Sequence, residues 1–106
     1  MDKQTKAVFG ARAAIIKAMA HPSRLYMLER LQERPHCVCE LTELVGADKS
    51  TVSKHLTVLK NAGVVNCEKH GVEVHYALRM PCINKFFSCV ESVLKMNLEE
   101  SQRLVA

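Results

Sequence analysis

Residues 37–63, CVCELTELVGADKSTVSKHLTVLKNAG, contain two helical patterns separated by a short turn at Gly46. Asp48 precedes the second pattern, where its carboxylate can accept hydrogen bonds from the first free N–H groups of a helix. Gly63 follows this pattern, at the position where helices commonly end in a left-handed residue. The stretch therefore predicts a helix-turn-helix unit over residues about 39–62.

The second helix of this unit has two contrasting faces. Val52, Leu56 and Leu59 share one side at helical spacing, as expected of a helix that packs on a core. The other side carries hydroxyl and ammonium groups, which can contact phosphates or base edges, and residues 49–60 include no Asp or Glu. This face is predicted to bind DNA. The candidate DNA-binding residues of the helix are Lys49, Ser50, Thr51, Ser53, Lys54, His55, Thr57 and Lys60.

His55 stands apart from the other candidates because its helical angle lies nearer to the apolar stripe than to the polar one. We expect its ring to be partly buried or to contact a phosphate, and not to read a base. For the polar face as a whole, the plain alternative is an ordinary solvated surface. The tight turn, the preceding helix and the following hairpin agree with one another and favour DNA binding over that alternative.

Further helical patterns precede and follow the helix-turn-helix unit. One covers residues about 5–19, and the next begins at Pro22, whose missing N–H suits the first position of a helix. Pro81 opens a last helix over residues about 82–97. The chain therefore has four predicted helices, then a segment of different periodicity, then a fifth helix.

The segment before Pro81 has the periodicity of β-structure. From Val72 to Leu78, apolar residues alternate with polar or small ones, as on a half-buried strand. Residues 64–69 are a plausible partner strand, and His70–Gly71 supply a turn. This hairpin, a wing over residues about 64–79, completes a mainly α winged helix-turn-helix fold. Lys69 and His70 at its tip are also candidate DNA-binding residues.

The composition is compatible with this fold and limits the other classes. The 106 residues suffice for one compact domain with a core but not for two. A net charge of +4 permits nucleic-acid binding without requiring it. No apolar run approaches the length of about 18 residues that a membrane span needs, and the polar first residues do not form a secretory signal. We therefore expect a cytoplasmic protein without membrane contact.

Three stretches, AHPSRLYMLERL, CVCEL and DKSTVSKHLTVLKNAGVV, resemble the ArsR/SmtB family of winged-helix repressors. The resemblance covers residues about 11–95, and the CVC triplet resembles the arsenic-responding branch. It implies a homodimer, held by the first and last helices, that binds an inverted repeat in double-stranded operator DNA. It also implies that the chain is not an enzyme and has no organic cofactor. The implied inducer is As(III) or Sb(III), whose binding relieves repression of a metalloid-resistance operon.

Cys37 and Cys39 are the first candidate ligands for such an inducer. In an extended chain their side chains point the same way, whereas in a helix they diverge, so a shared ion requires an unwound helix start. The positive end of a helix dipole favours thiolate, and thiolates select soft ions, including Cd(II), Pb(II) and Cu(I) as well as As(III). His36 beside the pair could donate a nitrogen, although a loop histidine is more often solvated.

The third ligand that As(III) prefers is not evident in the sequence. The best-known pattern of the family, CVCDLC, has a third cysteine where this chain has Thr42. Cys82 and Cys89 lie on one face of the last helix and are candidate ligands, although the same face could pack a dimer interface. Cys67 lies in a predicted strand, where core packing is favoured over ligation. A small cellular thiol is the remaining alternative.

A trigger by thiol oxidation or polysulfide is the main alternative to a metalloid inducer. Five cysteines in a chain without export signals fit ligands, redox sensors or core residues. A disulfide between Cys37 and Cys39 is disfavoured by strain, but one involving Cys82 or Cys89 is not. A thiol enzyme is the weakest alternative, because no His, Asp or Lys constellation lies beside a cysteine.

Overall fold

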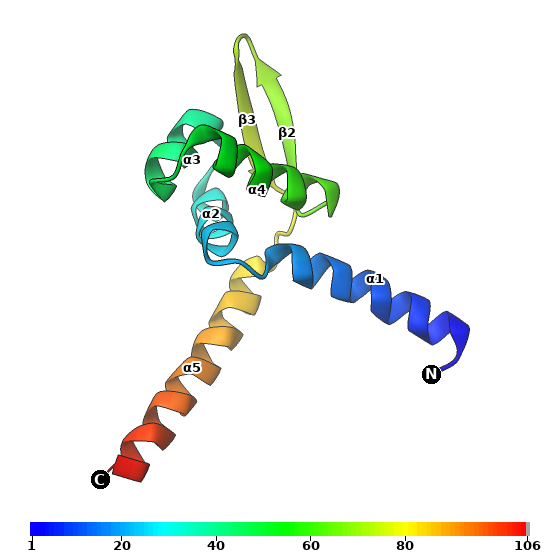
Figure 1. Cartoon of the computed structure of the whole chain (residues 1–106), viewed down its shortest axis with the longest axis vertical. Helices are drawn as coiled ribbons and strands as arrows, with labels where there is room; N and C mark the ends of the chain where they lie inside the picture. The colour runs from blue at the N-terminus through cyan, green and yellow to red at the C-terminus, as the bar shows by residue number, and fades with distance from the viewer. Residues whose placement is uncertain (106) are drawn as a thin grey trace.

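The computed structural model describes residues 1–105, which form five helices and three strands (Figure 1). The mainly α fold with a β-hairpin wing is confirmed. The last helix, predicted to end near residue 97, continues to Val105. The elements are α1 (Lys3–Met19), α2 (Pro22–Glu33), β1 (His36–Cys37), α3 (Val38–Val45), α4 (Lys49–Asn61), β2 (Val65–His70), β3 (Glu73–Leu78) and α5 (Ile83–Val105).

The boundaries of the helix-turn-helix unit follow from its capping residues. Asp48 Oδ1 accepts a hydrogen bond of 2.7 Å from the backbone N–H of Thr51, as predicted for the start of α4. Gly46 caps the C-terminal end of α3 with φ of 74°, and Gly63 follows α4 with φ of 79°. Both angles lie in the left-handed region that glycine adopts without steric cost, so these two glycines set the turns on either side of α4.

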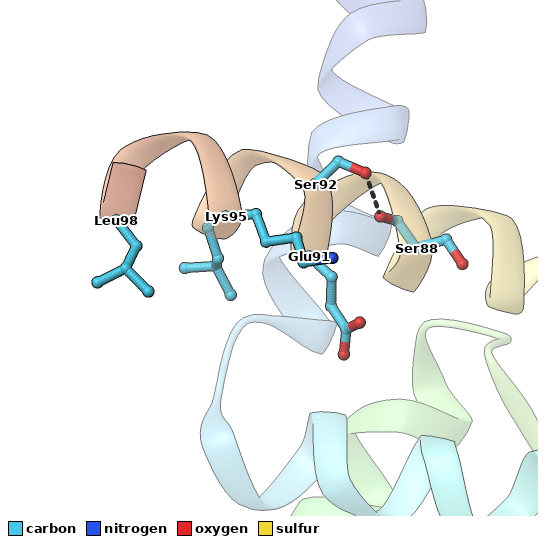
Figure 2. Close-up of a pocket in the computed structure, with 6 residues that line it drawn as sticks. Ser88, Glu91, Ser92, Lys95 and Leu98 are labelled. Carbon is cyan, nitrogen blue, oxygen red and sulfur yellow. Dashed lines mark hydrogen bonds between the residues drawn. The ribbon is translucent and has the colours of Figure 1, made fainter. Parts of the chain in front are cut away.

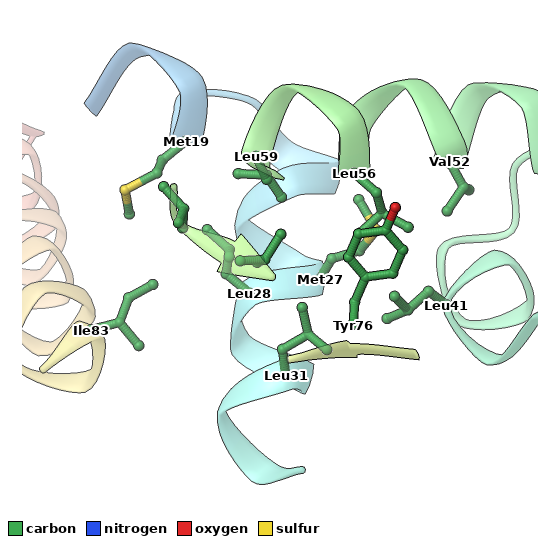
Figure 3. Close-up of a cluster of buried hydrophobic side chains, with 12 residues drawn as sticks. Met19, Met27, Leu28, Leu31, Leu41, Val52, Leu56, Leu59, Tyr76 and Ile83 are labelled. Atoms are coloured by element: carbon green, nitrogen blue, oxygen red, sulfur yellow. The ribbon is translucent and has the colours of Figure 1, made fainter. Parts of the chain in front are cut away.

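The core lies where α2, α3 and α4 meet the sheet (Figure 3). The predicted stripe of α4, Val52, Leu56 and Leu59, is completely buried in it. These residues fix the rotation of α4 about its axis and thereby turn its polar face to solvent. The core cluster consists of Met19, Met27, Leu28, Leu31, Leu41, Val52, Leu56, Leu59, Val64, Val65, Tyr76 and Ile83.

The sheet contains a strand that the sequence did not predict. Its order is β1-β3-β2, with the two-residue strand β1 antiparallel to β3 and with Cys37 opposite His75. The prediction that Val72 belongs to a half-buried strand is wrong, because Val72 is 99% exposed in the turn after Gly71. The hairpin turn therefore lies one residue later than the predicted turn at His70–Gly71.

The two terminal helices extend away from this core in different directions (Figure 1). The radius of gyration is 16.8 Å, whereas a compact chain of this length has about 13 Å. Both helices leave large apolar side chains exposed, which is unusual for a monomeric surface. These residues include Val8, Phe9, Ile15 and Ile16 of α1 and Phe86, Val90, Val93 and Leu94 of α5. None of the described helices has both the length and the apolar character needed to cross a membrane.

Candidate DNA-reading surface and thiol site

The polar face of α4 lies at the surface of the chain. Ser50, Lys54 and Thr57 are exposed, and Ser53 between them is half-buried. The hydroxyl of Thr57 donates to the carbonyl of Ser53 at 2.9 Å, which leaves the Thr57 oxygen as an acceptor toward solvent. Lys49, Thr51 and Lys60 are also exposed. These candidate side chains are thus accessible along α4, while their contact with DNA stays a prediction.

The tip of the wing carries carboxylates that sequence reasoning overlooked. Lys69 and His70 are exposed there, but the His70 ring lies 4.7 Å from the His75 ring, measured between centroids. Nε2 of His70 is 3.4 Å from a Glu68 carboxylate oxygen. Glu68 and His70 alternate along β2, and the hairpin register places them opposite His75 and Glu73 of β3. This alternation and register could have revealed the cluster of these four side chains. The wing therefore presents less positive charge than Lys69 and His70 alone suggest. The second carboxylate of the cluster, from Glu73, lies 3.0 Å from His75 Nε2.

His55 is partly buried, as its helical angle predicted. Its Nδ1 accepts a hydrogen bond of 3.2 Å from Nε of Arg24, and its ring lies 4.3 Å from that of His21. Burial lowers the pKa of His55, and the neighbouring charges of His21 and Arg24 lower it further. The ring of His55 is therefore held against α2, and this contact was not visible in the sequence.

Cys37 has an unexpected structural role at the start of α3. Its backbone is extended, and its Sγ accepts a hydrogen bond of 3.4 Å from the N–H of Glu40. The Glu40 carboxylate in turn accepts from the N–H of Cys37 at 3.3 Å. This is a capping box in which cysteine occupies the usual serine or threonine position. Cys37 is only 7% exposed, so this candidate ligand is buried, whereas Cys39 is exposed.

Glu40 joins this cap to two basic neighbours that sequence reasoning did not consider. Arg34 Nη2 donates to its carboxylate at 2.8 Å, and Nδ1 of His36 lies 3.3 Å from the same oxygen. The Arg34 hydrogen bond, followed by that from the Cys37 N–H, lowers the pKa of Glu40 to about 2. The spacing Cys-x-x-Glu at a helix start is the sequence signal that could have identified the pair.

His36 is not solvated, which corrects the expectation for a loop histidine. It is 5% exposed, because β1 pairs it with Tyr76 of β3. Its Nδ1 faces Glu40, while its Nε2 is buried without a hydrogen-bond partner among residues 1–105. The ring therefore supports the strand that carries Cys37 and is not free to turn toward the thiols.

We expect the stability of the fold at acid pH to depend on the capping box between Cys37 and Glu40. Because the folded pKa of Glu40, about 2, lies below its ordinary value of 4.5, the carboxylate stabilises the fold above pH 4.5. This contribution is lost as the pH falls from 4.5 through about 2. Glu40→Gln should lower the urea midpoint near pH 7 and lose its effect toward pH 2. Glu43→Gln, exposed on the same helix, is the control, and equal effects of both variants would contradict the assignment.

The two thiols border one cleft that also reaches the DNA-reading surface. The cleft has a volume of about 530 Å³ and is lined by Cys37 and Cys39 on one side. Lys49 and Ser53 of α4 form another part of its wall. The remaining lining comes from Val38 and from the hairpin residues Val72, Glu73, Val74 and Tyr76. Cys39 is exposed at this site.

The other cysteines do not join this pair within one chain. Cys82 and Cys89 are exposed at the start and on the side of α5, and Cys67 is half-buried against the core, as predicted. Among residues 1–105, no three His, Cys, Asp or Glu side chains converge in a way that could hold a metal ion. The candidate set Cys37, Cys39, Cys82 and Cys89 therefore does not form a single site in the protomer. Cys37 and Cys39 are the two cysteines that line the cleft beside α4.

Comparison with known proteins identifies the family of this chain. Residues 21–66 match the profile described as "Bacterial regulatory protein, arsR family". The uncharacterized HTH-type transcriptional regulator Rv0081 of Mycobacterium tuberculosis is 33% identical over 98 residues, which cover 92% of this chain and 86% of that protein. Its crystal structure superposes with a TM-score of 0.76 at 34% identity, covering 89% of this chain and 95% of that chain.

A second solved structure extends the likeness over almost the whole chain. The homodimeric winged helix-turn-helix DNA-binding domain Mb0332 from Mycobacterium bovis superposes with a TM-score of 0.78 at 25% identity. The match covers 94% of this chain and 93% of that domain. The winged helix-turn-helix described above and the matched sequence agree, and the chain belongs to the ArsR family of bacterial regulatory proteins.

Proposed function

We propose that this chain is a transcriptional repressor that releases its operator when arsenite or antimonite binds Cys37 and Cys39. One observation carries the proposal: both thiols line the same cleft as Lys49 and Ser53 of α4. An ion held by the thiols therefore lies beside side chains that are candidates for DNA contact. No other described cysteine lines that cleft, which directs the proposal to this pair.

DNA recognition is assigned to α4 and the wing. The exposed hydroxyl and ammonium groups of α4 fit the edges and phosphates of the major groove, and α3 supports this helix from behind. The wing tip, with Lys69 and His70, faces the flanking backbone or minor groove. Its two carboxylates limit how strongly this tip can bind phosphate.

A homodimer is part of the proposal. The apolar side chains exposed on α1 and α5 would be covered by a second copy, and the matched domain Mb0332 is described as homodimeric. Figure 2 shows a hollow along α5 between Ser88, Glu91, Ser92, Lys95 and Leu98. Side chains of α5 alone bound this hollow, so it does not enclose a ligand and instead marks a helix side without a partner. A two-fold dimer would place two copies of α4 about 34 Å apart on an inverted repeat.

Trivalent arsenic binds soft thiolates and takes three sulfurs. Cys37 and Cys39 supply two of them, and the third comes from the partner subunit's Cys82 or Cys89, or from a small cellular thiol. The sulfur of Cys37 keeps lone pairs after coordination, so the N–H of Glu40 can still donate to it while it binds the ion. Cys39 lies within the first turn of α3, so the pair meets only when this turn opens.

Opening the first turn of α3 affects α4 directly, because Leu41 of α3 and Leu56 of α4 share the core cluster. By linkage, the ion binds free repressor more tightly than DNA-bound repressor, by the same factor by which it weakens DNA binding. Coupling between sites is typically about 1–3 kcal/mol, which corresponds to a change in affinity of about 5–150-fold.

Titration with arsenite under reducing conditions tests the proposal. An operator duplex is first selected from a random-sequence library with the full chain. Arsenite should then produce a sulfur–arsenic absorption band and lower the affinity for this duplex by about 5–150-fold. Unchanged DNA affinity at saturating arsenite would refute the proposed trigger.

Oxidation is the second candidate trigger, because Cys39, Cys82 and Cys89 are exposed and free. In that case a mild oxidant or a polysulfide releases the operator, and arsenite does not. The mass of the released protein then shows either the loss of two hydrogens for each disulfide formed or the addition of sulfur atoms. Cd(II), Pb(II) and Cu(I) are tested in the same titration, since they select the same ligands.

A further inference from the structure

The side chain of Arg24 in α2 makes hydrogen bonds to both α1 and α4. Nη1 of Arg24 in α2 donates to the carbonyl of Ala18 at the end of α1, at 2.8 Å. Nε of the same side chain donates to Nδ1 of His55 in α4, at 3.2 Å. Both hydrogen bonds are partly buried, so water competes with them less than at the surface. The contact thereby fixes α4 against the end of α1.

The hydrogen bonds to His55 and His21 show which ring nitrogen of each side chain accepts. His55 Nδ1 accepts from Arg24, and His21 Nδ1 accepts from the N–H of Ser23 at 3.1 Å, which caps α2. Arg24 can only donate, so Nδ1 of His55 carries no proton in this contact, and the His55 ring is neutral with its proton on Nε2. The two rings lie 4.3 Å apart between centroids. Both rings thus act as hydrogen-bond acceptors through Nδ1.

Protonation of His55 would replace this acceptor with a donor. An N–H on Nδ1 would then face the N–H of Arg24, and the new positive charge would lie beside the guanidinium. Among residues 1–105, the groups whose charge acts on His55 are His21, from the turn before α2, and Arg24, from α2. Burial is the largest cause that lowers the pKa of His55 below 6.5. The charges of His21 and Arg24, both basic, lower it further. A protonated His55 therefore has no compensating partner on the elements packed against it.

We propose that Arg24 and His55 form a positioning link between α1 and the DNA-reading helix, and that protonation of His55 releases it. Arg24 acts through His55 and needs no contact with DNA itself. The link joins α4 to α1 and α2, and it involves none of the cysteines. It therefore adds a response to mild acid that is independent of the metalloid trigger. Only its effect on DNA affinity rests on the proposed repressor function.

The direction of the effect follows from linkage. Because the folded pKa of His55 is lowered, the unfolded chain binds more protons in the window between that value and 6.5. The stability that the link contributes is complete above pH 6.5 and is lost as the pH falls through the folded value. We expect an operator affinity about fivefold lower near pH 5.5 than near pH 7.5, the low end of typical coupling between sites.

His55→Asn is the test variant, because the Asn oxygen can accept from Arg24 but does not titrate. The matched control is His70→Asn, which removes an exposed histidine from the wing and is compared by its urea midpoint alone, because His70 is itself a candidate DNA contact. For each full-length protein, the urea midpoint and the operator affinity are measured near pH 7.5 and pH 5.5. Imidazole ¹⁵N NMR of the wild type reports the tautomer of His55 directly. The pH dependence of the urea midpoint should be reduced in His55→Asn and retained in His70→Asn, and the pH dependence of operator affinity should be reduced in His55→Asn.

The proposal fails if His55 carries its proton on Nδ1 at neutral pH, or if His55→Asn and wild type have parallel pH profiles. Should His55→Asn not fold, Arg24→Lys replaces it, since lysine keeps the charge but cannot bridge Ala18 and His55 together. Arg24→Lys should lower operator affinity near neutral pH and flatten its pH profile. The NMR and urea measurements need no DNA, so they decide on the link even if the repressor proposal is wrong.

Discussion

Cys37→Ser and Cys39→Ser are each expected to abolish operator release by arsenite while leaving operator binding unchanged. A serine hydroxyl does not bind As(III) as a thiolate does, so the release factor of about 5–150-fold should fall to near unity. The Cys37→Ser variant should nevertheless fold, because serine is a favoured N-cap and can accept from the N–H of Glu40 in place of sulfur. The measurement is operator affinity with and without arsenite, in the presence of a reductant.

Cys67→Ser is the matched control for this prediction. Cys67 is half-buried on β2 and does not line the cleft, so its loss should leave the arsenite response intact. A gain is expected from Thr42→Cys, since residues 39 and 42 are neighbours on the helix surface and a third sulfur would become available locally. A Cys37→Ser or Cys39→Ser protein that still releases DNA on arsenite addition would place the inducer elsewhere, with α5 as the next candidate.

Lys54→Ala is expected to produce the largest loss of DNA affinity among single changes on α4. Its side chain is exposed at the centre of the polar face, between Ser53 and Thr57. If Lys54 contacts a phosphate, its loss weakens binding to all DNA sequences. The slope of log K against log[salt] should then become shallower by about 1. If it meets a base edge, the loss is about 1–3 kcal/mol and the sequence preference at that position relaxes.

Lys3→Ala controls for the general loss of one positive charge. Lys3 is exposed at the start of α1, at the far end of that helix from the core (Figure 1). It should change the salt slope much less than Lys54→Ala does. Equal slopes for the two variants would mean that α4 binds no differently from the rest of the basic surface, and the solvated-face alternative would then hold.

Local sequence signals were sufficient for most of the fold. The caps at Asp48 and Gly63 and the buried stripe of α4 depend on neighbours within a few residues, and each is present as predicted. The strand β1 could not be predicted, because two residues are too few to show a period. The error at Val72 has a related cause, since alternation continues from the strand into the turn and cannot mark its end.

The candidate site was predicted less completely because its geometry depends on distant residues. The burial of Cys37 and His36 results from pairing with His75 and Tyr76, far along the chain. The link between Arg24 and His55 likewise spans two helices. Residue types and spacing identified which side chains carry the chemistry, whereas the topology determined which of them meet.

The pairing of β1 with β3 has a consequence for how an inducer acts on DNA contact. Strand β1 ends at Cys37, and α3 begins directly after it. Cys37 pairs with His75 in β3 and also caps α3 with its sulfur. Any displacement of this one residue is therefore passed both to α3, which supports α4, and to the middle of β3 in the wing. Major-groove and flanking contacts should therefore weaken together, so that footprints of the partly induced protein shrink at both regions in parallel and never at one alone.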